Sequence, residues 1–264
     1  MIHLISTAEH SRLDWLPQFV GHYRALGVER FHISVHFEPT VARAATADAC
    51  RAAEETLARL GTELFAAVIC PFDAGAMRSH HDRVQDRIAG PGDWIVWADL
   101  DEFQEYPGAL AELLREADEQ GYDFFAGSFV DRVAADGRLV DFDPARPIWE
   151  QYPAKCYLTR DVAQAFDTKV ACARAHIRLT PGNHWLWHEE ELVAYPEWVD
   201  VHHFKWDASV IPRLRRRLEP DWKRRCGWWT ESARLLEHFD RNGGGVDPAL
   251  LELDGERARC ASPR

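Results

Sequence analysis

The chain has 264 residues, of which 46% are hydrophobic, and its 43 acidic and 31 basic residues give a net charge of −12. This length and composition predict one large globular domain, and the acidic balance argues against a general nucleic-acid-binding protein, whose phosphate contacts need a basic surface. No apolar run is long enough for a transmembrane helix, and residues 1–6 lack the basic start of a signal peptide.

Strand and helix signals alternate through the first hundred residues. Apolar runs predict strands at residues 2–6, 31–35, 64–70 and 94–98. Apolar residues at helical spacing predict helices at 14–26, 42–60 and 77–88. Repeated strand–helix units of this length indicate an α/β fold with a parallel sheet and helices on both faces.

The pattern becomes more irregular after residue 105. A helix is predicted at 109–119, a hairpin of strands 124–133 and 139–142 around Asp136-Gly137, short strands at 155–160 and 169–178, and a helix at 207–217. Residues 144–153 are proline-rich and irregular, and the tail after Arg241 is predicted to be a docked or frayed helix. We expect one catalytic domain over 1–240, with halves at 1–105 and 106–240, and a C-terminal tail at 241–264.

Three carboxylates follow the predicted strand at 94–98 directly, namely Asp99, Asp101 and Glu102. On an extended backbone Asp99 and Asp101 point to the same side. In open α/β sheets ligands bind beyond the carboxyl ends of the strands, and carboxylate oxygens suit a divalent cation that holds a substrate phosphate. A solvated turn after a strand is the alternative that the motif alone leaves open.

Three segments together resemble the family-2-like glycosyltransferases. They are residues 15–28, which resemble the opening helix, the Asp99-Leu100-Asp101-Glu102-Phe103 metal motif, and the late segment His202-His203-Phe204-Lys205-Trp206. The resemblance extends over about residues 1–215. It implies a GT-A-type, Rossmann-like nucleotide-binding sheet with an irregular acceptor-side half. It also implies the inverting transfer of a hexose from a nucleotide-diphosphate-sugar, with Mn²⁺ or Mg²⁺.

The resemblance also suggests which residues bind the metal ion. Asp101 is the expected direct ligand, and Asp99 contacts the ribose or the ion through water. His203 is the expected third ligand, with His202 and His184 as alternatives, although each of these histidines is equally compatible with a place in the core. A cation in this position would neutralise the charge of the leaving diphosphate.

Donor-binding residues are expected on both halves of the chain. Thr7 and Glu9 follow the first strand, where this fold holds the nucleotide base. Arg83 and Lys205 are candidates for binding the diphosphate, but Arg83 also suits a surface pair with Asp86, and Lys205 also suits an exposed position. A UDP-sugar is the expected donor, although residues 35–38 lack the acidic-Gly-Ser run of the family and leave the nucleotide open.

The acceptor side is less defined. An inverting transfer needs a general base, and Glu189 and Asp131 are the candidates. Trp185 and Trp187 offer a stacking surface for a sugar ring. Lys169 matches a family lysine before a strand, and pairing with Asp167 is its plainest role. The acceptor is expected to be a small molecule, a glycan or a peptide.

Two other functions remain open. A non-catalytic GT-A-like protein would bind a nucleotide without turnover. A zinc hydrolase would use His184 and His188, which have the i, i+4 spacing of a helical zinc site but lack the glutamate between them. The six cysteines are scattered without C-x-x-C spacing, which predicts free thiols in the cytoplasm. The basic helix around 209–218 is compatible with a peripheral contact to a membrane.

Overall fold

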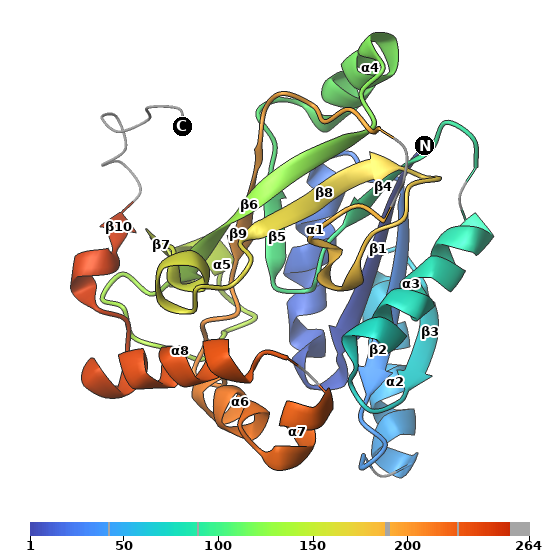
Figure 1. Ribbon diagram of the computed structural model, residues 1–264. Coiled ribbons are helices and arrows are strands. Elements are labelled where there is room, and N and C mark those ends of the chain that lie inside the picture. The colour runs from blue at the N-terminus through green and yellow to red at the C-terminus, as the bar shows by residue number, and fades with distance from the viewer. Residues whose placement is uncertain (42, 89, 188–190, 226, 254–264) are drawn as a thin grey trace. The chain divides into compact units, whose positions relative to one another are not determined.

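The computed structural model describes residues 1–41, 43–88, 90–187, 191–225 and 227–253 (Figure 1). The chain forms two compact units. Unit 1 comprises Met1–Phe129 and Asp167–Val201, and unit 2 comprises Val130–Phe166 and His202–Arg264. Two strands, β6 (Phe124–Val133) and β9 (Val199–His203), contribute residues to both units.

The sheet of unit 1 has a parallel core. Its strands are β1 (Ile2–Glu9), β2 (Arg30–Phe37), β3 (Leu64–Ile69), β4 (Trp94–Trp97), β5 (Glu102–Glu105) and β8 (Thr168–Arg174), with the first part of β6. The order is β6-β8-β4-β1-β2-β3; β1 to β4 are parallel, and β8 and β6 run antiparallel to their neighbours. From β1 the chain builds the sheet outward through β2 and β3, and then returns to place β4 on the other side. This creates a topological switch point between β1 and β4.

Helices lie on both faces of this sheet. They are α1 (Leu16–Ala25), α2 (Arg43–Arg59) and α3 (Ala74–Ile88), with 3-10 turns at His10–Trp15 and Pro181–Asn183. Helix α4 (Leu110–Gln120) lies beyond the upper end of β6 in Figure 1. Right-handed crossovers place α1 and α2 on one face and α3 on the other, because β4 lies in the opposite direction from β2 and β3. Figure 1 shows α3 in front of the strands and α1 behind them. The predicted α/β fold is therefore confirmed.

The buried residues of unit 1 follow the periodicity expected for its helices and strands. Leu16, Phe19, Val20 and Tyr23 are buried at helical spacing along α1. Every residue of β4 is buried, as expected for a parallel strand covered on both faces. One hydrophobic cluster joins β1, α3, β4 and β8, and includes Ile5, Val84, Ile95, Trp97, Val170, Ala173, Ala175, Ile177 and Leu179.

Unit 2 packs helices against short strands. Its elements are α5 (Ile148–Gln151), β7 (Ala154–Cys156), a π-helical turn at Leu158–Val162, α6 (Val210–Arg217), α7 (Pro220–Arg225), α8 (Trp229–Arg241), a 3-10 turn at Pro248–Leu250, and β10 (Glu252–Leu253). Trp206, Val210, Leu214, Leu235 and Phe239 belong to its core. Helix α8 is absent from the elements predicted above.

Two expectations for this unit are wrong. Residues 139–142 do not form the second strand of a hairpin, because β7 occupies the edge of β6 instead, with Asp131 opposite Cys156 and Val133 opposite Ala154. The carbonyl of Val140 accepts hydrogen bonds from the hydroxyl of Tyr152 and from a backbone amide. Residues 242–253 form turns and β10 rather than a helix, and residues 254–264 lie outside the described part of the chain.

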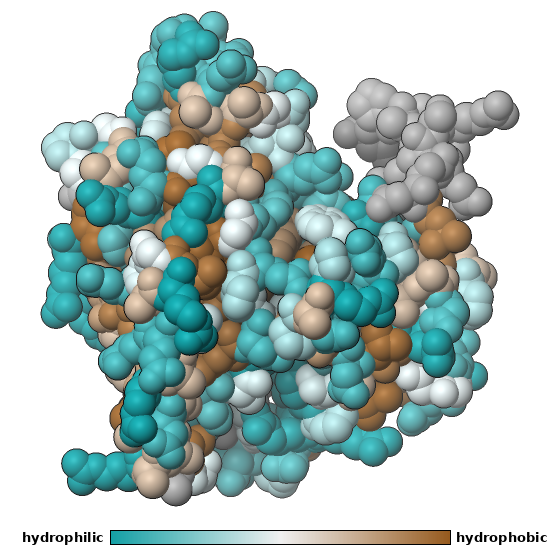
Figure 2. Space-filling view, turned by 180° about the vertical axis from the view of Figure 1, so that it is seen from behind, coloured by the Kyte–Doolittle hydropathy of each residue, from teal (hydrophilic) through white to brown (hydrophobic). Residues whose placement is uncertain are grey.

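The surface is largely hydrophilic on the face shown in Figure 2, with hydrophobic residues in separate areas between polar ones. Among the described residues, no helix has the length and apolar character needed to cross a bilayer. Several large hydrophobic side chains are nevertheless exposed, among them Trp185, Trp187, Trp198 and Trp229.

Candidate functional site

The acidic motif forms a turn at the carboxyl end of β4, next to the switch point. The amide of Glu102 donates to the carbonyl oxygen of Asp99 over 2.9 Å, and the amide of Asp99 donates to Oε2 of Glu102 over 3.1 Å. The backbone is therefore not extended here, and the expectation that Asp99 and Asp101 share one side of a strand is wrong. In this turn Glu102 and Asp99 lie near Lys169, whereas Asp101 pairs with Arg12.

Glu102 is buried and forms an ion pair with Lys169 of β8. Their charged atoms are 2.8 Å apart, and Nζ of Lys169 lies 3.5 Å from Asp99 and 2.9 Å from the carbonyl oxygen of Gly182. Burial raises the pKa of Glu102 above its ordinary value, and the positive charge of Lys169 opposes this shift. Burial lowers the pKa of Lys169, but Glu102 and Asp99 outweigh it, so the net shift is upward and the ammonium stays charged. Lys169 thus pairs with Glu102 and Asp99, and not with Asp167.

Asp101 pairs with Arg12, which follows β1. Nη1 of Arg12 lies 2.8 Å from Oδ2 of Asp101, and the side chain of Asp101 is only 16% exposed. The guanidinium of Arg12 also stacks over the ring of Trp15 at 4.1 Å. Asp99, with 51% of its side chain exposed, is the more accessible of the two aspartates. Arg12 is not predictable from the sequence as a partner of Asp101, because nothing local links residues that are 89 positions apart.

Helix α3 covers the switch point with a histidine and an arginine. Oγ1 of Thr7, on β1, lies 2.9 Å from Nε2 of His81. Burial, followed by the positive charge of Arg78, lowers the pKa of His81 to about 3, so the imidazole is neutral. Arg78 is buried against the ring of Trp97 at 4.7 Å and binds Asn183. The predicted Arg83 is exposed on the same helix, so Arg78 is the arginine of α3 that lies at this site.

Glu9 ends β1 and is partly buried beside the start of the 3-10 turn. The other predicted base, Glu189, and the predicted zinc ligand His188 lie outside the described residues. Nδ1 of His184 donates to the carbonyl oxygen of Thr168 over 2.7 Å. Of the two histidines proposed as zinc ligands, only His184 lies among the described residues. A carbonyl oxygen accepts, so Nδ1 carries the proton.

Asp131 is fully buried in unit 2 and accepts several hydrogen bonds. Thr159 donates through its amide and hydroxyl at 2.6 and 2.9 Å, Trp206 donates through Nε1 at 2.7 Å, and Nδ1 of His203 lies 3.1 Å away. Burial raises the pKa of Asp131, but His203 and these donors outweigh it and lower the pKa below its ordinary value. A buried, charged and fully hydrogen-bonded carboxylate is a poor proton acceptor, which disfavours the predicted role of general base.

The other predicted residues of unit 2, at positions 202, 203 and 205, have different partners. His203 is buried, and its Nδ1 faces Asp131, an arrangement that also orients metal-binding histidines. His202 instead accepts from Nε of Arg132 at 3.1 Å. The ammonium of Lys205 lies over the ring of Trp206 at 4.6 Å. His203 as metal ligand and Lys205 as diphosphate ligand stay predictions.

The acidic turn contains carboxylate oxygens of the type that bind divalent cations, and Asp101 is already paired with Arg12. Among the described residues, no three His, Cys, Asp or Glu side chains gather into a group that could hold a metal ion. A magnesium ion at a nucleotide needs only one or two protein carboxylates, because phosphates and water complete its coordination. The carboxylates of Asp99 and Asp101 are hard oxygen donors of this type.

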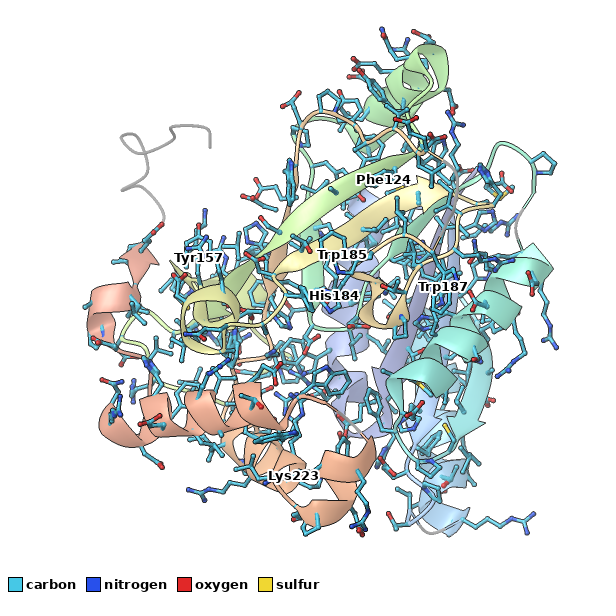
Figure 3. All side chains as sticks on the ribbon, in the orientation of Figure 1. Phe124, Tyr157, His184, Trp185, Trp187 and Lys223 are labelled. Carbon is cyan, nitrogen blue, oxygen red and sulfur yellow. The ribbon has the colours of Figure 1, made fainter. Side chains whose placement is uncertain are left out.

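The segment after β8 presents two tryptophans to solvent. Leu186 bridges to Leu179 and packs against the core, while Trp185 and Trp187 on either side of it are 53% and 68% exposed. Figure 3 shows both tryptophans and His184 on the segment that passes in front of β8 toward α3. Outward-facing indoles at i and i+2 are compatible with the predicted stacking surface.

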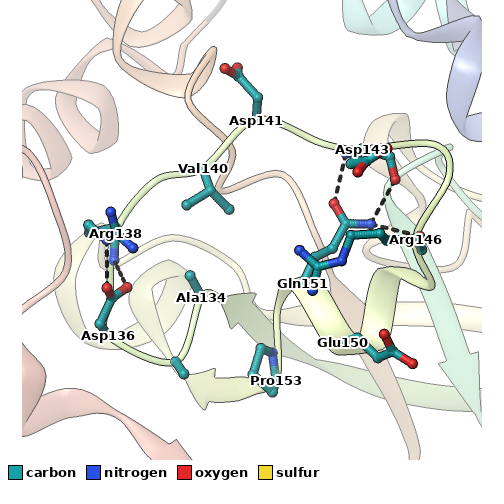
Figure 4. Close-up of a pocket in the computed structure, with 11 residues that line it drawn as sticks. Ala134, Asp136, Arg138, Val140, Asp141, Asp143, Arg146, Glu150, Gln151 and Pro153 are labelled. Atoms are coloured by element: carbon teal, nitrogen blue, oxygen red, sulfur yellow. Dashed lines mark hydrogen bonds and ion pairs between the residues drawn. The ribbon is translucent and has the colours of Figure 1, made fainter.

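A separate pocket of about 360 Å³ lies in unit 2 (Figure 4). Gln151 shapes its wall, because its amide group bonds the amide of Asp143 and the carbonyl oxygens of Asp143 and Arg146. An ion pair between Asp136 and Arg138 forms another part of the lining. None of the predicted site residues lines this pocket, which leaves the acidic turn as the candidate site.

Comparisons with known proteins do not identify a family. No family model matches the chain, and no curated protein matches it. Among solved structures, the chain is similar to a UDP-glucose pyrophosphorylase complexed with UDP-glucose, with a TM-score of 0.26 and 10% sequence identity over 70% of this chain and 74% of that chain. A TM-score this low establishes neither a common fold nor a common ligand.

Proposed function

We propose that this chain is a glycosyltransferase that moves a hexose, with inversion, from a nucleotide-diphosphate-sugar to a small-molecule, glycan or peptide acceptor. The observation that carries the proposal is the acidic turn at the carboxyl end of β4, beside the β1/β4 switch point. Asp99 and Asp101 would supply oxygen ligands there, and Lys169 and Arg12 carry positive charge next to them. A UDP-sugar is the expected donor.

The turn combines carboxylates that would hold a cation with positively charged side chains that would bind the phosphates of a nucleoside diphosphate. Asp99 and Asp101 would hold Mn²⁺ or Mg²⁺, which when bound neutralises charge on the leaving diphosphate. Arg12 offers a planar guanidinium at the end of β1 that suits a phosphate oxygen pair. Lys169 is buried and already bonded to Glu102, so its role is to fix the shape of the turn and to offset its negative charge.

Binding is tested by thermal unfolding with UDP, GDP and UDP-hexoses in Mn²⁺ or in EDTA. A ligand that binds the folded state stabilises it by about 2.7 kcal/mol at a hundred times its Kd, which raises Tm. We expect a rise in Tm that requires Mn²⁺. In Asp99→Asn, at least ten times more ligand should be needed to reach the same rise in Tm. Asp48→Asn, which removes an exposed carboxylate of α2, is the matched control and should behave as the wild type.

Turnover distinguishes the enzyme from a non-catalytic nucleotide-binding protein. With the donor that raises Tm most, release of free sugar or transfer to an acceptor supports the transferase. Binding without sugar release or transfer from any donor favours the non-catalytic alternative. If no nucleotide or nucleotide-sugar raised Tm in the presence of Mn²⁺, the assignment of the acidic turn as a donor site would be wrong.

A further inference from the structure

Unit 2 carries a concentration of positive charge that the proposed function does not use. Between residues 210 and 224 the sequence has six basic and two acidic residues, in a chain whose net charge is −12. Three tryptophans, at 222, 228 and 229, lie in or just after this segment. We call the side chains of Arg215, Arg216, Arg217, Trp222, Lys223, Trp228 and Trp229 the basic–aromatic patch.

Three contacts between cations and rings link members of the patch on α6, α7 and the start of α8, and one of these rings, that of Trp222, is itself buried. Arg216 of α6 lies over the ring of Trp222 of α7 at 5.0 Å. Lys223 of α7, labelled in Figure 3, lies over the ring of Trp229 at the start of α8 at 5.1 Å. Arg217 lies over Trp228 at 5.4 Å in the same way. The patch therefore spans α6, α7 and the first turn of α8.

Helix α6, which carries the arginines of the patch, packs against the hydrophobic core of unit 2. Val210 and Leu214, one helical turn apart on α6, are buried in the hydrophobic cluster. Arg215 and Arg216 are consequently exposed on the other side of the helix, and Lys223 is exposed on α7. Trp229 stays 45% exposed despite its contact with Lys223. The fold thus holds cations and an indole ring together at the surface.

This combination fits an anionic lipid surface better than a nucleic acid. Clustered Arg and Lys residues are attracted to anionic headgroups, each contributing about a fivefold gain in partitioning, and tryptophan side chains favour the interface between headgroups and acyl chains. The excess negative charge of the rest of the chain is repelled by the same membrane, which would orient the molecule with the patch toward it. The bases of a single-stranded nucleic acid also stack on exposed indoles, so binding to polyuridylate is the competing outcome in the test below.

We propose that the basic–aromatic patch binds the surface of anionic phospholipid membranes, with Arg215, Arg216 and Lys223 at the headgroup phosphates and Trp229 at the interface. This binding is peripheral, and it does not depend on the proposed transferase activity. It would bring the protein to substrates carried by a membrane.

The proposal is tested by sedimentation of the full chain with lipid vesicles. Vesicles of phosphatidylcholine with about one third phosphatidylglycerol should bind the protein at low salt and release it at about 1 M salt, where the Debye length is near 3 Å. Arg215→Glu/Lys223→Glu should weaken binding at least tenfold. Arg51→Glu/Arg115→Glu, which makes the same change in net charge on α2 and α4, should weaken it far less. Thermal melts of both variants confirm that each is folded.

Four results would overturn the proposal. They are no binding to the anionic vesicles, equal binding to pure phosphatidylcholine, equal loss in the two double variants, and tighter binding to polyuridylate than to the vesicles. Contact of the indole is tested separately with brominated lipids, which quench tryptophan fluorescence at the interface. Trp229→Phe should reduce this quenching, and unchanged quenching would refute the placement of Trp229.

Discussion

His81 should make the stability of this protein sensitive to mild acid. Its Nε2 lies 2.9 Å from Oγ1 of Thr7, and its ring lies 5.8 Å from that of Trp97. Burial and the charge of Arg78 lower its pKa from 6.5 to about 3 in the folded state. Because the folded pKa lies below the unfolded pKa, the neutral His81 contributes stability above pH 6.5, and this contribution is lost as the pH falls toward 3.

The size of the effect follows from proton linkage. Between pH 7 and pH 5 an unfolded histidine of pKa 6.5 takes up a proton that the folded His81 does not. This difference lowers the free energy of unfolding by about 2 kcal/mol over that range. The variant His81→Gln keeps a polar group near Thr7 but does not titrate, so it should lose about 2 kcal/mol of this pH dependence, whatever its stability at pH 7.

Urea unfolding followed by circular dichroism at pH 7, 6 and 5 measures the dependence directly. His176→Gln, which removes an exposed histidine, is the matched control for the loss of one histidine. An identical pH dependence in the wild type and in His81→Gln would refute the reasoning. So would a titration of His81 near pH 6 in the folded protein, observed by NMR.

Three further variants test packing and charge through urea unfolding. Gly127→Ala should lower the free energy of unfolding by about 1–3 kcal/mol, because the added Cβ would lie 2.7 Å from the carbonyl oxygen of Val199. Gly21→Ala has open space around its Cβ and should be neutral or stabilising, so similar losses of stability in the two variants would contradict this account. Lys169→Met should cost about 3–5 kcal/mol by leaving Glu102 buried and unpaired, and adding Glu102→Gln should recover part of the loss; no recovery would show that the pair is not the cause. Asp131→Asn should cost about 3 kcal/mol, because it replaces a charged acceptor of several donors, and a loss below about 0.5 kcal/mol would rule out this role.

Much of the fold was predictable from local patterns. The strands at 2–6, 31–35, 64–70 and 94–98 and the helices between them lie within a few residues of the observed elements, because apolar periodicity and helix-ending glycines act locally. The same patterns allow a helix at 229–241, where Leu235, Leu236 and Phe239 are buried, but it was not predicted. The hairpin at 124–142 failed because strand pairing depends on competition among distant segments, and β7 takes the edge of β6.

For the candidate site, too, local sequence patterns predict some features and the tertiary structure decides the others. Local patterns place three carboxylates at the end of a buried strand, and a strand–helix alternation implies that this end faces a ligand. The tertiary structure decides what each carboxylate contacts. Lys169 contacts Glu102 and the half-exposed Asp99, and Arg12 contacts Asp101. These partners come from β8 and from the turn after β1, and only the crossovers of the sheet bring such distant segments together. Sequence periodicity therefore determines which elements form, whereas long-range packing determines which charges meet.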